Sequence, residues 1–370
     1  MTANWTAATR AEHNPAPEPR AAADAAAKAR QMAAAHWSAA IIQAAVQLQI
    51  VDALDDGEPT SLETIAQRAN CPPDRVLRLM RALVAMGYFA HLGGKLYVHT
   101  DLSRSLLADT PFSVRNLVLL GGSAWNWVAW NGLSDSVRDS EPAFTQHYGK
   151  SLYEYFAQDN PEAGAVFNRS MSESGRWTTP AVVEALDVSG VGEIADIGGG
   201  QGGLLAAVLE RHPQLRGQLV DNASVIEQAD GRLREGPLAG RCSLVAADIR
   251  QSVPVTADLF VLRQVMHIWD DDTCARLLSN CIAGCPAGTR VILVEHLLTD
   301  DSAADPPNPV FSTQIDLLMM LIGGGRERTL ANFRSVFEQA GLQFARVQPT
   351  STPFALIEGV VPGIEGVVPG

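Results

Sequence analysis

Glycines and carboxylates in the segment Asp196–Gly203, which reads DIGGGQGG, could bind a nucleotide-like cofactor. Gly198, Gly200 and Gly203 fit the pattern G-x-G-x-x-G, in which the backbone approaches a ligand closely and helix amides are exposed to it. Asp221 ends the next apolar run, where a carboxylate can accept hydrogen bonds from ribose hydroxyls. NAD and S-adenosylmethionine share these needs, so the glycine pattern alone is compatible with either.

Three features separate the two cofactors. Asp196 lies two residues before the first glycine, where a carboxylate suits the free ammonium group of S-adenosylmethionine better than a pyrophosphate. Asp248 ends the third apolar run, where it could accept a hydrogen bond from an adenine amino group while Ile249 packs on the ring. The glycine segment also begins halfway along the chain, whereas many dehydrogenases carry theirs near the start. These features favour S-adenosylmethionine, and a nicotinamide oxidoreductase is the rival enzyme class.

The chain around and after the glycine segment predicts an α/β domain with a Rossmann-like, mostly parallel sheet flanked by helices. Short apolar runs alternate with amphipathic stretches from Val191 onward, as in βαβ units. The predicted strands span 192–199, 216–221, 241–248, 257–265, 289–298 and 354–360, and the predicted helices span 202–212, 271–284 and 329–341.

The chain before the glycine segment predicts a helical domain with the order of a winged helix. Thr60 and Glu63 fit a T-x-x-E capping box at the start of a short helix, and Gly93-Gly94 fits a hairpin turn between two short strands. The predicted helices span 21–54, 61–70 and 73–86.

A basic stripe on the third of these helices raises the alternative of a DNA-binding regulator. Arg75, Arg78 and Arg81 recur every three residues, as they would on a helix that faces a DNA groove. The formal net charge of the chain is −13, which disfavours phosphate binding. A solvated helix face beside a dimer core is therefore the favoured interpretation.

Length and composition indicate a multidomain globular protein. The 370 residues exceed the usual size of a single core, and no apolar run reaches the roughly 20 residues of a membrane span. The first residues lack the apolar stretch of a secretory signal, so we predict a cytoplasmic protein. The predicted parts are a flexible arm (1–20), a winged-helix-like domain (21–115), a helical connector (116–184), the cofactor domain (185–358) and a tail (359–370) with the repeated sequence IEGVVPG.

The ordered motifs IADIGGGQGGLLAAVLERHPQLRGQLVDNASVI, VAADIR, LFVLRQVMHIWDDD, VILVEH and GGRERT resemble those of the metal-independent, small-molecule O-methyltransferases of class I. That family includes plant caffeic acid and flavonoid enzymes and bacterial enzymes for mitomycins, anthracyclines and phenazines. The resemblance covers roughly residues 25–358. It implies S-adenosylmethionine as cofactor, a hydroxyl on a small aromatic metabolite as acceptor, and a homodimer built by a winged-helix-like domain that does not bind DNA or a membrane.

The resemblance also implies roles for individual residues. His267 matches the general base, with Glu295 and Glu327 as its flanking carboxylates, and histidine is the usual residue to take a phenolic proton near neutral pH. No metal is expected. The implied cofactor residues are Gly198, Gly200, Asp221, Asp248, Ile249 and Arg263, and the implied substrate residues are Trp125, Met171, Asp316 and Met320.

Several residues leave alternatives open. Asp270–Asp272 could bind magnesium, but their position before a helix favours capping. Ile268 stands where the family commonly has aspartate, which keeps N- or C-methylation and cofactor-assisted hydroxylation or decarboxylation as alternatives within the same fold. The cysteines are predicted to be buried or idle thiols rather than metal ligands; they are Cys71, Cys242, Cys274, Cys281 and Cys285.

Overall fold

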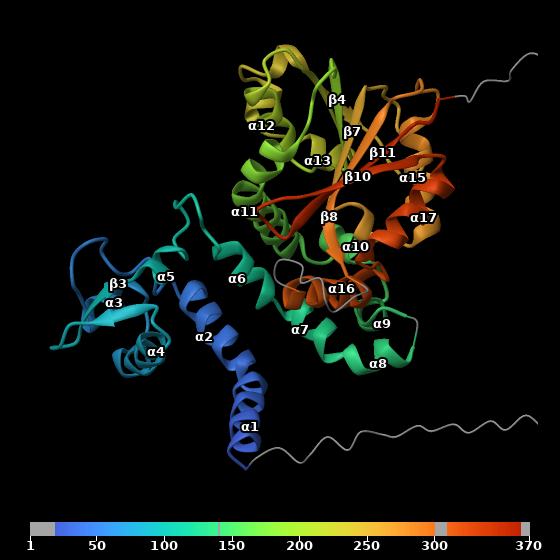
Figure 1. Ribbon diagram of the computed structural model, residues 1–370. Coiled ribbons are helices and arrows are strands. Elements are labelled where there is room, and N and C mark those ends of the chain that lie inside the picture. The colour runs from blue at the N-terminus through green and yellow to red at the C-terminus, as the bar shows by residue number, and fades with distance from the viewer. Residues whose placement is uncertain (1–18, 140, 300–308, 364–370) are drawn as a thin grey trace, which may run out of the picture.

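The computed structural model describes residues 19–139, 141–299 and 309–363, which form a small N-terminal domain, a helical connector and a large α/β domain (Figure 1). Most of the predicted arm and the second IEGVVPG copy lie outside these residues. Pro19 and Arg20, placed in the predicted arm, already belong to the first helix. Within the described residues, no helix combines the length and the apolar character that a membrane span requires.

The N-terminal domain confirms the predicted order of helices followed by a hairpin. Its sheet has the strand order β1-β3-β2, and its core includes Ile50, Met80, Leu83 and Phe89. The single helix predicted over 21–54 is wrong, because two helices are present and turns follow Gln47. The elements are α1 (Pro19–Ala33), α2 (Ala35–Gln47), β1 (Thr60–Ser61), α3 (Leu62–Arg68), α4 (Pro73–Ala85), β2 (Phe89–His91) and β3 (Leu96–His99).

The predicted capping box at Thr60 is also wrong. Thr60 is extended and pairs with Tyr97 in β1, and its hydroxyl accepts a hydrogen bond from the backbone of Asp55 (2.9 Å). Ser61 caps α3 instead, because its hydroxyl accepts the backbone N–H of Thr64 (3.1 Å). The hairpin therefore fixes the start of the helix one residue later than the motif suggests.

The connector consists of short helices that end in one long helix. Its largest side chains pack into an aromatic cluster around Trp125, Phe144 and Phe156. The helices are α5 (Asp101–Arg104), α6 (Arg115–Gly121), α7 (Ala124–Asn131), α8 (Leu133–Arg138), α9 (Ala143–Tyr148), α10 (Leu152–Gln158) and α11 (Pro161–Ala185).

The α/β domain contains a sheet with the strand order β10-β11-β8-β7-β4-β5-β6, and β9 pairs with β8 outside that path. The pairs among β4, β5, β6, β7 and β8 are parallel, whereas β11 runs antiparallel to β8 and β10. The strands are β4 (Glu193–Ile197), β5 (Arg216–Asp221), β6 (Cys242–Ala246), β7 (Leu259–Arg263), β8 (Arg290–Leu298), β9 (Arg328–Thr329), β10 (Gln343–Pro349) and β11 (Phe354–Val360).

Helices cover both faces of this sheet, and each face has its own apolar core. α16 packs against the end of β8, α7 and α9, so it joins the connector to the sheet (Figure 1). The helices are α12 (Gly203–Arg211), α13 (Ala223–Ile226), α14 (Gly231–Arg234), α15 (Asp271–Ile282), α16 (Pro309–Gly323) and α17 (Leu330–Ala340).

All six predicted strands are confirmed in position: β5 and β11 have the predicted bounds, and the other four are shorter than predicted, whereas β9 and β10 were not predicted. β10 is an edge strand with many exposed positions, so it lacks the apolar run that marked the others. β4 lies between β7 and β5, and the chain leaves β4 and β7 at the same edge of the sheet. In open parallel sheets, ligands bind at this kind of edge where neighbouring connections diverge.

Two glycines after β4 test how tightly this edge is packed. Gly200 and Gly202 both have positive φ, but a Cβ on Gly202 would lie 2.5 Å from Leu233 and one on Gly200 would meet nothing within 4 Å. We expect Gly200→Ala to cost about 1–2 kcal/mol of unfolding free energy through backbone strain. Gly202→Ala adds roughly 1–3 kcal/mol from overpacking. Urea unfolding of both variants measures the difference, and equal losses would contradict the packing argument.

Candidate active site

The loop Gly198–Gly202, here called the glycine loop, connects β4 to α12 and is anchored to β5. Gly198 N donates to the carbonyl of Val220 (2.8 Å), and Gly200 N donates to Oδ2 of Asp221 (2.8 Å). The structure therefore brings together Gly198, Gly200 and Asp221, three of the predicted cofactor residues. Burial raises the pKa of Asp221, and its bonds to backbone amides oppose that shift.

Asp196 lies beneath the glycine loop as a buried carboxylate. Only 2% of the residue is exposed, and neither carboxylate oxygen has a hydrogen-bond partner among the described residues. A Cβ on Gly199 would lie 2.5 Å from its Cγ, so the loop passes directly over it. Burial raises the pKa of Asp196 to about 7, although the charge of Arg263 opposes the shift. An unpaired buried carboxylate is costly, and a ligand with positive charge or N–H donors would offset that cost.

Arg263, a further predicted cofactor residue, ends β7 and reaches toward the connector. Its Nη1 donates to the hydroxyl of Thr179 (2.9 Å), and its Nη2 donates to that of Thr178. The guanidinium also lies over the ring of Phe354, with 5.7 Å between Cζ and the ring centroid. Burial lowers the pKa of Arg263. These contacts link the cofactor side of the sheet to α11.

Asp248 and Ile249, the predicted adenine-binding pair, follow β6. Ile249 is buried, and its Cδ1 would lie 3.4 Å from a Cβ on Gly198, so it borders the glycine loop; its packing on an adenine ring stays a prediction. The carboxylate of Asp248 instead accepts hydrogen bonds from Arg250 (2.9 Å) and Gln251 (3.0 Å). The bond to Arg250 lowers the pKa of Asp248 to about 2. A hydrogen bond from adenine would therefore compete with these side chains.

His267 lies in a one-turn 3-10 segment directly after β7. The residues Val265–Trp269, here called the His267 turn, follow Gln264, which has a φ of 52° although it is not glycine. The imidazole Nδ1 of His267 donates to Oε1 of Glu327 (2.8 Å), and both residues are buried. Because Nδ1 is occupied, Nε2 is the nitrogen left to take a proton from a ligand.

Glu295, on β8, supports the same turn in a different way from the one predicted. Its Oε1 accepts the backbone N–H groups of Val265 (2.9 Å) and Met266 (2.8 Å), so it holds the backbone rather than the imidazole. Its other oxygen has no partner among the described residues. Burial raises the pKa of Glu295. Glu327 alone orients the ring directly.

The electrostatic setting favours the protonated imidazole. Burial alone would lower the pKa of His267, but the hydrogen bond to Glu327 and the charges of Glu295 and Glu327 outweigh it. The net result is a pKa above the ordinary value. Because its pKa is raised, the neutral imidazole of His267 is a stronger base than an ordinary histidine side chain.

The predicted substrate residues are distributed over several elements. Asp316, on α16, accepts the backbone N–H of Glu327 (2.8 Å) and so supports the residue that pairs with His267. Met320 lies half-buried one turn further along α16, and Met171 is exposed on α11. Trp125 is 3% exposed within the aromatic cluster, and its indole N–H has no partner among the described residues. Their substrate contacts stay predictions.

Two of the three aspartates at the start of α15 make hydrogen bonds or ion pairs within the fold. Asp270 caps the helix by accepting the backbone N–H of Thr273 (2.7 Å), which confirms the capping interpretation. Asp271 forms ion pairs with Arg326 and Arg328, which the sequence did not predict. The clearest sequence signal for Arg328 is its place beside Glu327 in GGRERT. The five cysteines are free, and two of them are fully buried.

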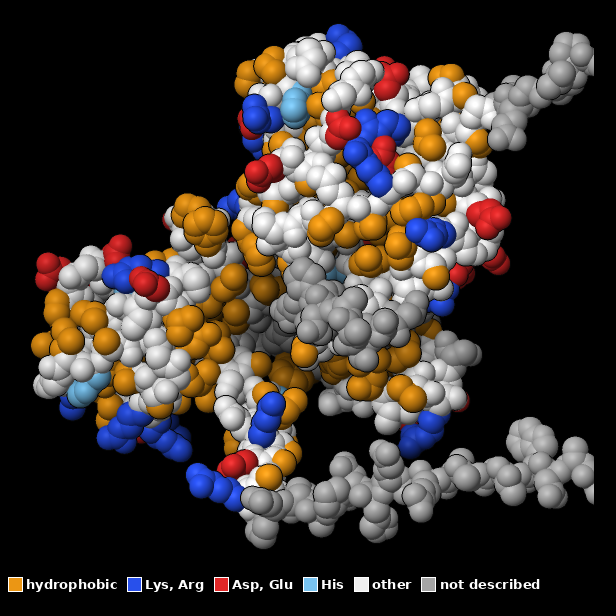
Figure 2. Space-filling view, viewed as in Figure 1, with side chains coloured by type: hydrophobic (Ala, Val, Ile, Leu, Met, Phe, Trp, Pro, Cys, Tyr) orange, Lys and Arg blue, Asp and Glu red, His pale blue; other side chains and the backbone are white. Residues whose placement is uncertain are grey.

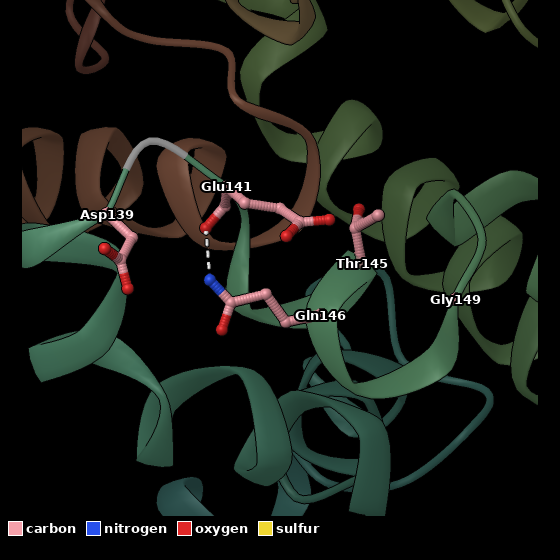
Figure 3. A pocket seen from close by; sticks show the side chains of 5 residues that line it. All are labelled: Asp139, Glu141, Thr145, Gln146 and Gly149. Atoms are coloured by element: carbon pink, nitrogen blue, oxygen red, sulfur yellow. Dashed lines mark hydrogen bonds between the residues drawn. The ribbon is translucent and has the colours of Figure 1, made fainter.

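The three groups around His267 also have the geometry of a metal site, because one ligand atom from each lies within 4.8 Å of the others. However, Nδ1 of His267 and Oε1 of Glu327 bind each other, and Oε1 of Glu295 binds two amides. These bonds leave Nε2 of His267 available to a ligand, and the second oxygens of Glu295 and Glu327 have no partner among the described residues. A separate surface hollow formed by Asp139, Glu141, Thr145, Gln146 and Gly149 contains none of the predicted site residues (Figure 3).

Comparisons with known proteins agree with this geometry. The chain matches the family models described as O-methyltransferase domain (residues 130–343) and O-methyltransferase dimerisation domain (residues 31–109). The chain therefore belongs to the O-methyltransferase family and is an S-adenosylmethionine-dependent enzyme. The match confirms the resemblance seen in the motifs.

Individual relatives span nearly the whole chain. The mitomycin biosynthesis 6-O-methyltransferase of Streptomyces lavendulae is 32% identical and covers 87% of this chain and 90% of its own length. Aclacinomycin 10-hydroxylase RdmB of Streptomyces purpurascens is also 32% identical, over 85% of this chain and 84% of its own. Among solved structures, CalO1, a methyltransferase in calicheamicin biosynthesis with S-adenosylhomocysteine bound, has a TM-score of 0.78 and 29% identity. It covers 94% of this chain and 100% of its own.

The electrostatics of His267 lead to a prediction for Glu327→Gln. The substitution keeps a hydrogen-bond acceptor but removes a negative charge that raises the pKa of His267, so that pKa falls. The acidic limb of the pH–rate profile, below which the imidazole is protonated, moves to lower pH. Nuclear magnetic resonance titration of the histidine ring measures the pKa. Glu338→Gln on the exposed face of α17 is the matched control, and an unchanged or higher pKa in Glu327→Gln would refute the assignment.

Proposed function

We propose that His267 is the general base that removes the proton from a phenolic hydroxyl of a small aromatic metabolite during methyl transfer. The oxygen–carbon bond to the acceptor forms as the sulfur–carbon bond of the donor breaks, and the hydroxyl proton passes to Nε2 of His267. When bound, S-adenosylmethionine supplies a methyl group on a positively charged sulfur with a neutral leaving group. The protein must then align the partners and accept one proton.

The observation that carries this proposal is the contact between the His267 turn and the glycine loop. A Cβ on Gly198 would lie 2.8 Å from Cγ2 of Val265, so the glycine loop and the His267 turn pack directly against each other. The buried pair of His267 and Glu327 is therefore held on a turn that borders the loop over Asp196. A methyl donor held by that loop and a proton acceptor on that turn share one site.

The cofactor residues fit S-adenosylmethionine. Asp196 offers two unpartnered buried oxygens for the ammonium group, and Asp221 stands at the end of β5 for ribose hydroxyls. Gly198 and Gly200 would allow the backbone to approach the ligand, with Ile249 alongside as an apolar surface for a base. These assignments are part of the proposal.

Replacement of the base tests the proposal. In His267→Ala we expect the methylation rate to fall about 10²–10⁴-fold while S-adenosylhomocysteine affinity, measured by calorimetry, stays within several-fold. Suitable acceptors are 3-amino-4-hydroxybenzoate and 2,7-dihydroxy-5-methyl-1-naphthoate, the compounds named for two Streptomyces relatives. His91→Ala on the exposed hairpin is the control. A near-normal rate in His267→Ala would sink the general-base role, and binding of NAD instead would overturn the cofactor assignment.

Hydroxylation is the second candidate function. Ile268 replaces the aspartate common at this position, and the relative named as a hydroxylase is as similar as the mitomycin enzyme. Mass spectrometry of the same reactions separates an added methyl group from an added oxygen atom.

The cytoplasmic location predicted from the sequence stays a prediction.

We further propose that the chain is a homodimer joined through its N-terminal domain. Apolar side chains are exposed on α1, α2 and α6, among them Met32 (68% exposed), Trp37 (64%) and Leu117 (45%). Figure 2 shows hydrophobic side chains over the region that α2 and α6 occupy. An apolar surface of this kind on a dimerisation domain is suited to a second copy of the chain.

Size-exclusion chromatography with light scattering tests the dimer. We expect a dimeric mass for the unmodified chain and a monomeric mass for Trp37→Asp at micromolar concentration, because a charge at a buried apolar contact is strongly unfavourable. Leu92→Asp, an exposed hydrophobic residue beside the hairpin turn, is the matched control and should stay dimeric. A monomeric mass for the unmodified chain would contradict the proposal.

A further inference from the structure

The His267 turn is poorly held by its own hydrogen bonds. The bonds from Ile268 N to Val265 O and from Trp269 N to Met266 O are both 3.4 Å long, near the limit for a hydrogen bond. Short 3-10 turns have weak internal geometry in general. The position of the imidazole therefore depends on groups outside the turn.

Arg328 supplies such support from β9. It is fully buried, and its Nη1 donates to the carbonyl of Met266 (2.7 Å) while its Nη2 donates to the carbonyl of Trp269 (2.7 Å). Its Nε donates to Oδ1 of Asp271 (2.8 Å), the residue that starts α15. One guanidinium thus joins both ends of the 3-10 segment to the next helix. Lysine has no planar fork of donors with which to do the same.

Gly325 brings the segment that carries Arg328 close to the turn. A Cβ on Gly325 would lie 2.1 Å from the carbonyl oxygen of His267 and 2.6 Å from the carbonyl carbon of Ile268. The backbone of residues 324–328 therefore packs directly on the backbone of the His267 turn. Glu327 and Arg328 reach the turn from this one segment, the first to the imidazole and the second to the carbonyls.

We propose that Arg328 is a positioning residue for the reaction: its guanidinium fixes the carbonyl side of the His267 turn, as Glu295 fixes the amide side, and so aims the imidazole at the acceptor. This inference rests on the proposed role of His267 as base. Glu295 binds the N–H groups of Val265 and Met266, and Arg328 binds the carbonyls of Met266 and Trp269. The turn is therefore clamped between a buried anion and a buried cation.

If Arg328 served only to stabilise the fold through its ion pair with Asp271, its burial would be explained, but its removal would weaken the whole domain without a specific effect on His267. Arg328 instead contacts the turn itself, and its positive charge opposes protonation of His267. A test that reads the pKa of His267 therefore separates positioning from general stability. The charged and titratable groups that face this region are Glu295, His296, Glu327, Arg328, Asp271, Arg326, Asp316 and Cys274, whose thiol also donates to the carbonyl of Met266 (3.1 Å).

The experiment compares Arg328→Lys and Arg328→Met with the unmodified enzyme. Resonance titration reports the pKa of His267, assigned from its absence in His267→Ala, and needs no acceptor. Calorimetry reports S-adenosylhomocysteine affinity. Steady-state rates with the two aromatic hydroxy acids named above report kcat and KM. Arg276→Lys and Arg276→Met, on the exposed face of α15, are the matched controls.

We expect both Arg328 variants to lose kcat on the order of 10²-fold, because a small misplacement of a catalytic group is costly. S-adenosylhomocysteine affinity should stay within several-fold. Arg328→Met should raise the pKa of His267, because a nearby positive charge is removed, and should move the acidic limb of the rate profile to higher pH. Arg328→Lys keeps the charge and should leave that pKa unchanged. The Arg276 variants should match the unmodified enzyme.

Wild-type kcat in Arg328→Lys, an unmoved pKa in Arg328→Met, or a parallel loss of cofactor affinity would each overturn the proposal. If Arg328→Met does not fold, Arg328→Lys and Asp271→Asn decide, since Asp271 is partly exposed and its amide variant only loosens the guanidinium. Full kcat in both would overturn the proposal. High activity in His267→Ala would instead refute the base itself, so the two failures are distinguishable.

Discussion

The structure around the site depends on burying several charges behind one short turn. Glu295, Glu327 and Arg328 are each almost fully removed from solvent, and each would be costly if it were alone. Their burial is tolerated because each makes hydrogen bonds: Glu327 to the imidazole of His267, and Glu295 and Arg328 to the backbone of the His267 turn. The turn in return gains a position that its two long internal bonds could not maintain. Removal of any one of these side chains leaves a buried polar group of another residue without its partner, so the geometry of the turn depends on the whole group.

The parallel sheet is what brings these charges to the glycine loop. β4 and β7 are hydrogen-bonded neighbours, so the loops that leave them begin at the same edge. The glycine loop and the His267 turn consequently touch through Gly198 and Val265. β8 lies beside β7 and β9 beside β8, which places Glu295 and Arg328 in order along that edge. α11 of the connector and α16 of the α/β domain are tied to this frame through Arg263 and Asp316.

The sequence predicted the parts of the fold that have strong local signals. Apolar runs marked the six buried or half-buried strands, and the glycine turn marked the hairpin of the N-terminal domain. Prediction failed where local patterns compete with tertiary pairing. Thr60 fits a capping box, but it belongs to β1 and pairs with Tyr97 of β3, so Ser61 caps the helix instead. β10 has too few apolar residues to stand out, because an edge strand is partly exposed on both faces.

For the site, the sequence by itself determined which residue types stand at the ends of the strands: the glycine loop, Asp221, His267, Glu295 and Glu327. Motif spacing is a property of the amino-acid sequence and can be read without the tertiary structure. Only the tertiary structure decided how the carboxylates divide their work, with Glu327 on the imidazole and Glu295 on the backbone. It alone revealed Arg328 as the cation of the group and the unpaired carboxylate of Asp196 beneath the loop. The reason is physical: burial and hydrogen-bond partners arise from strands and helices far apart in sequence, and no local pattern records them.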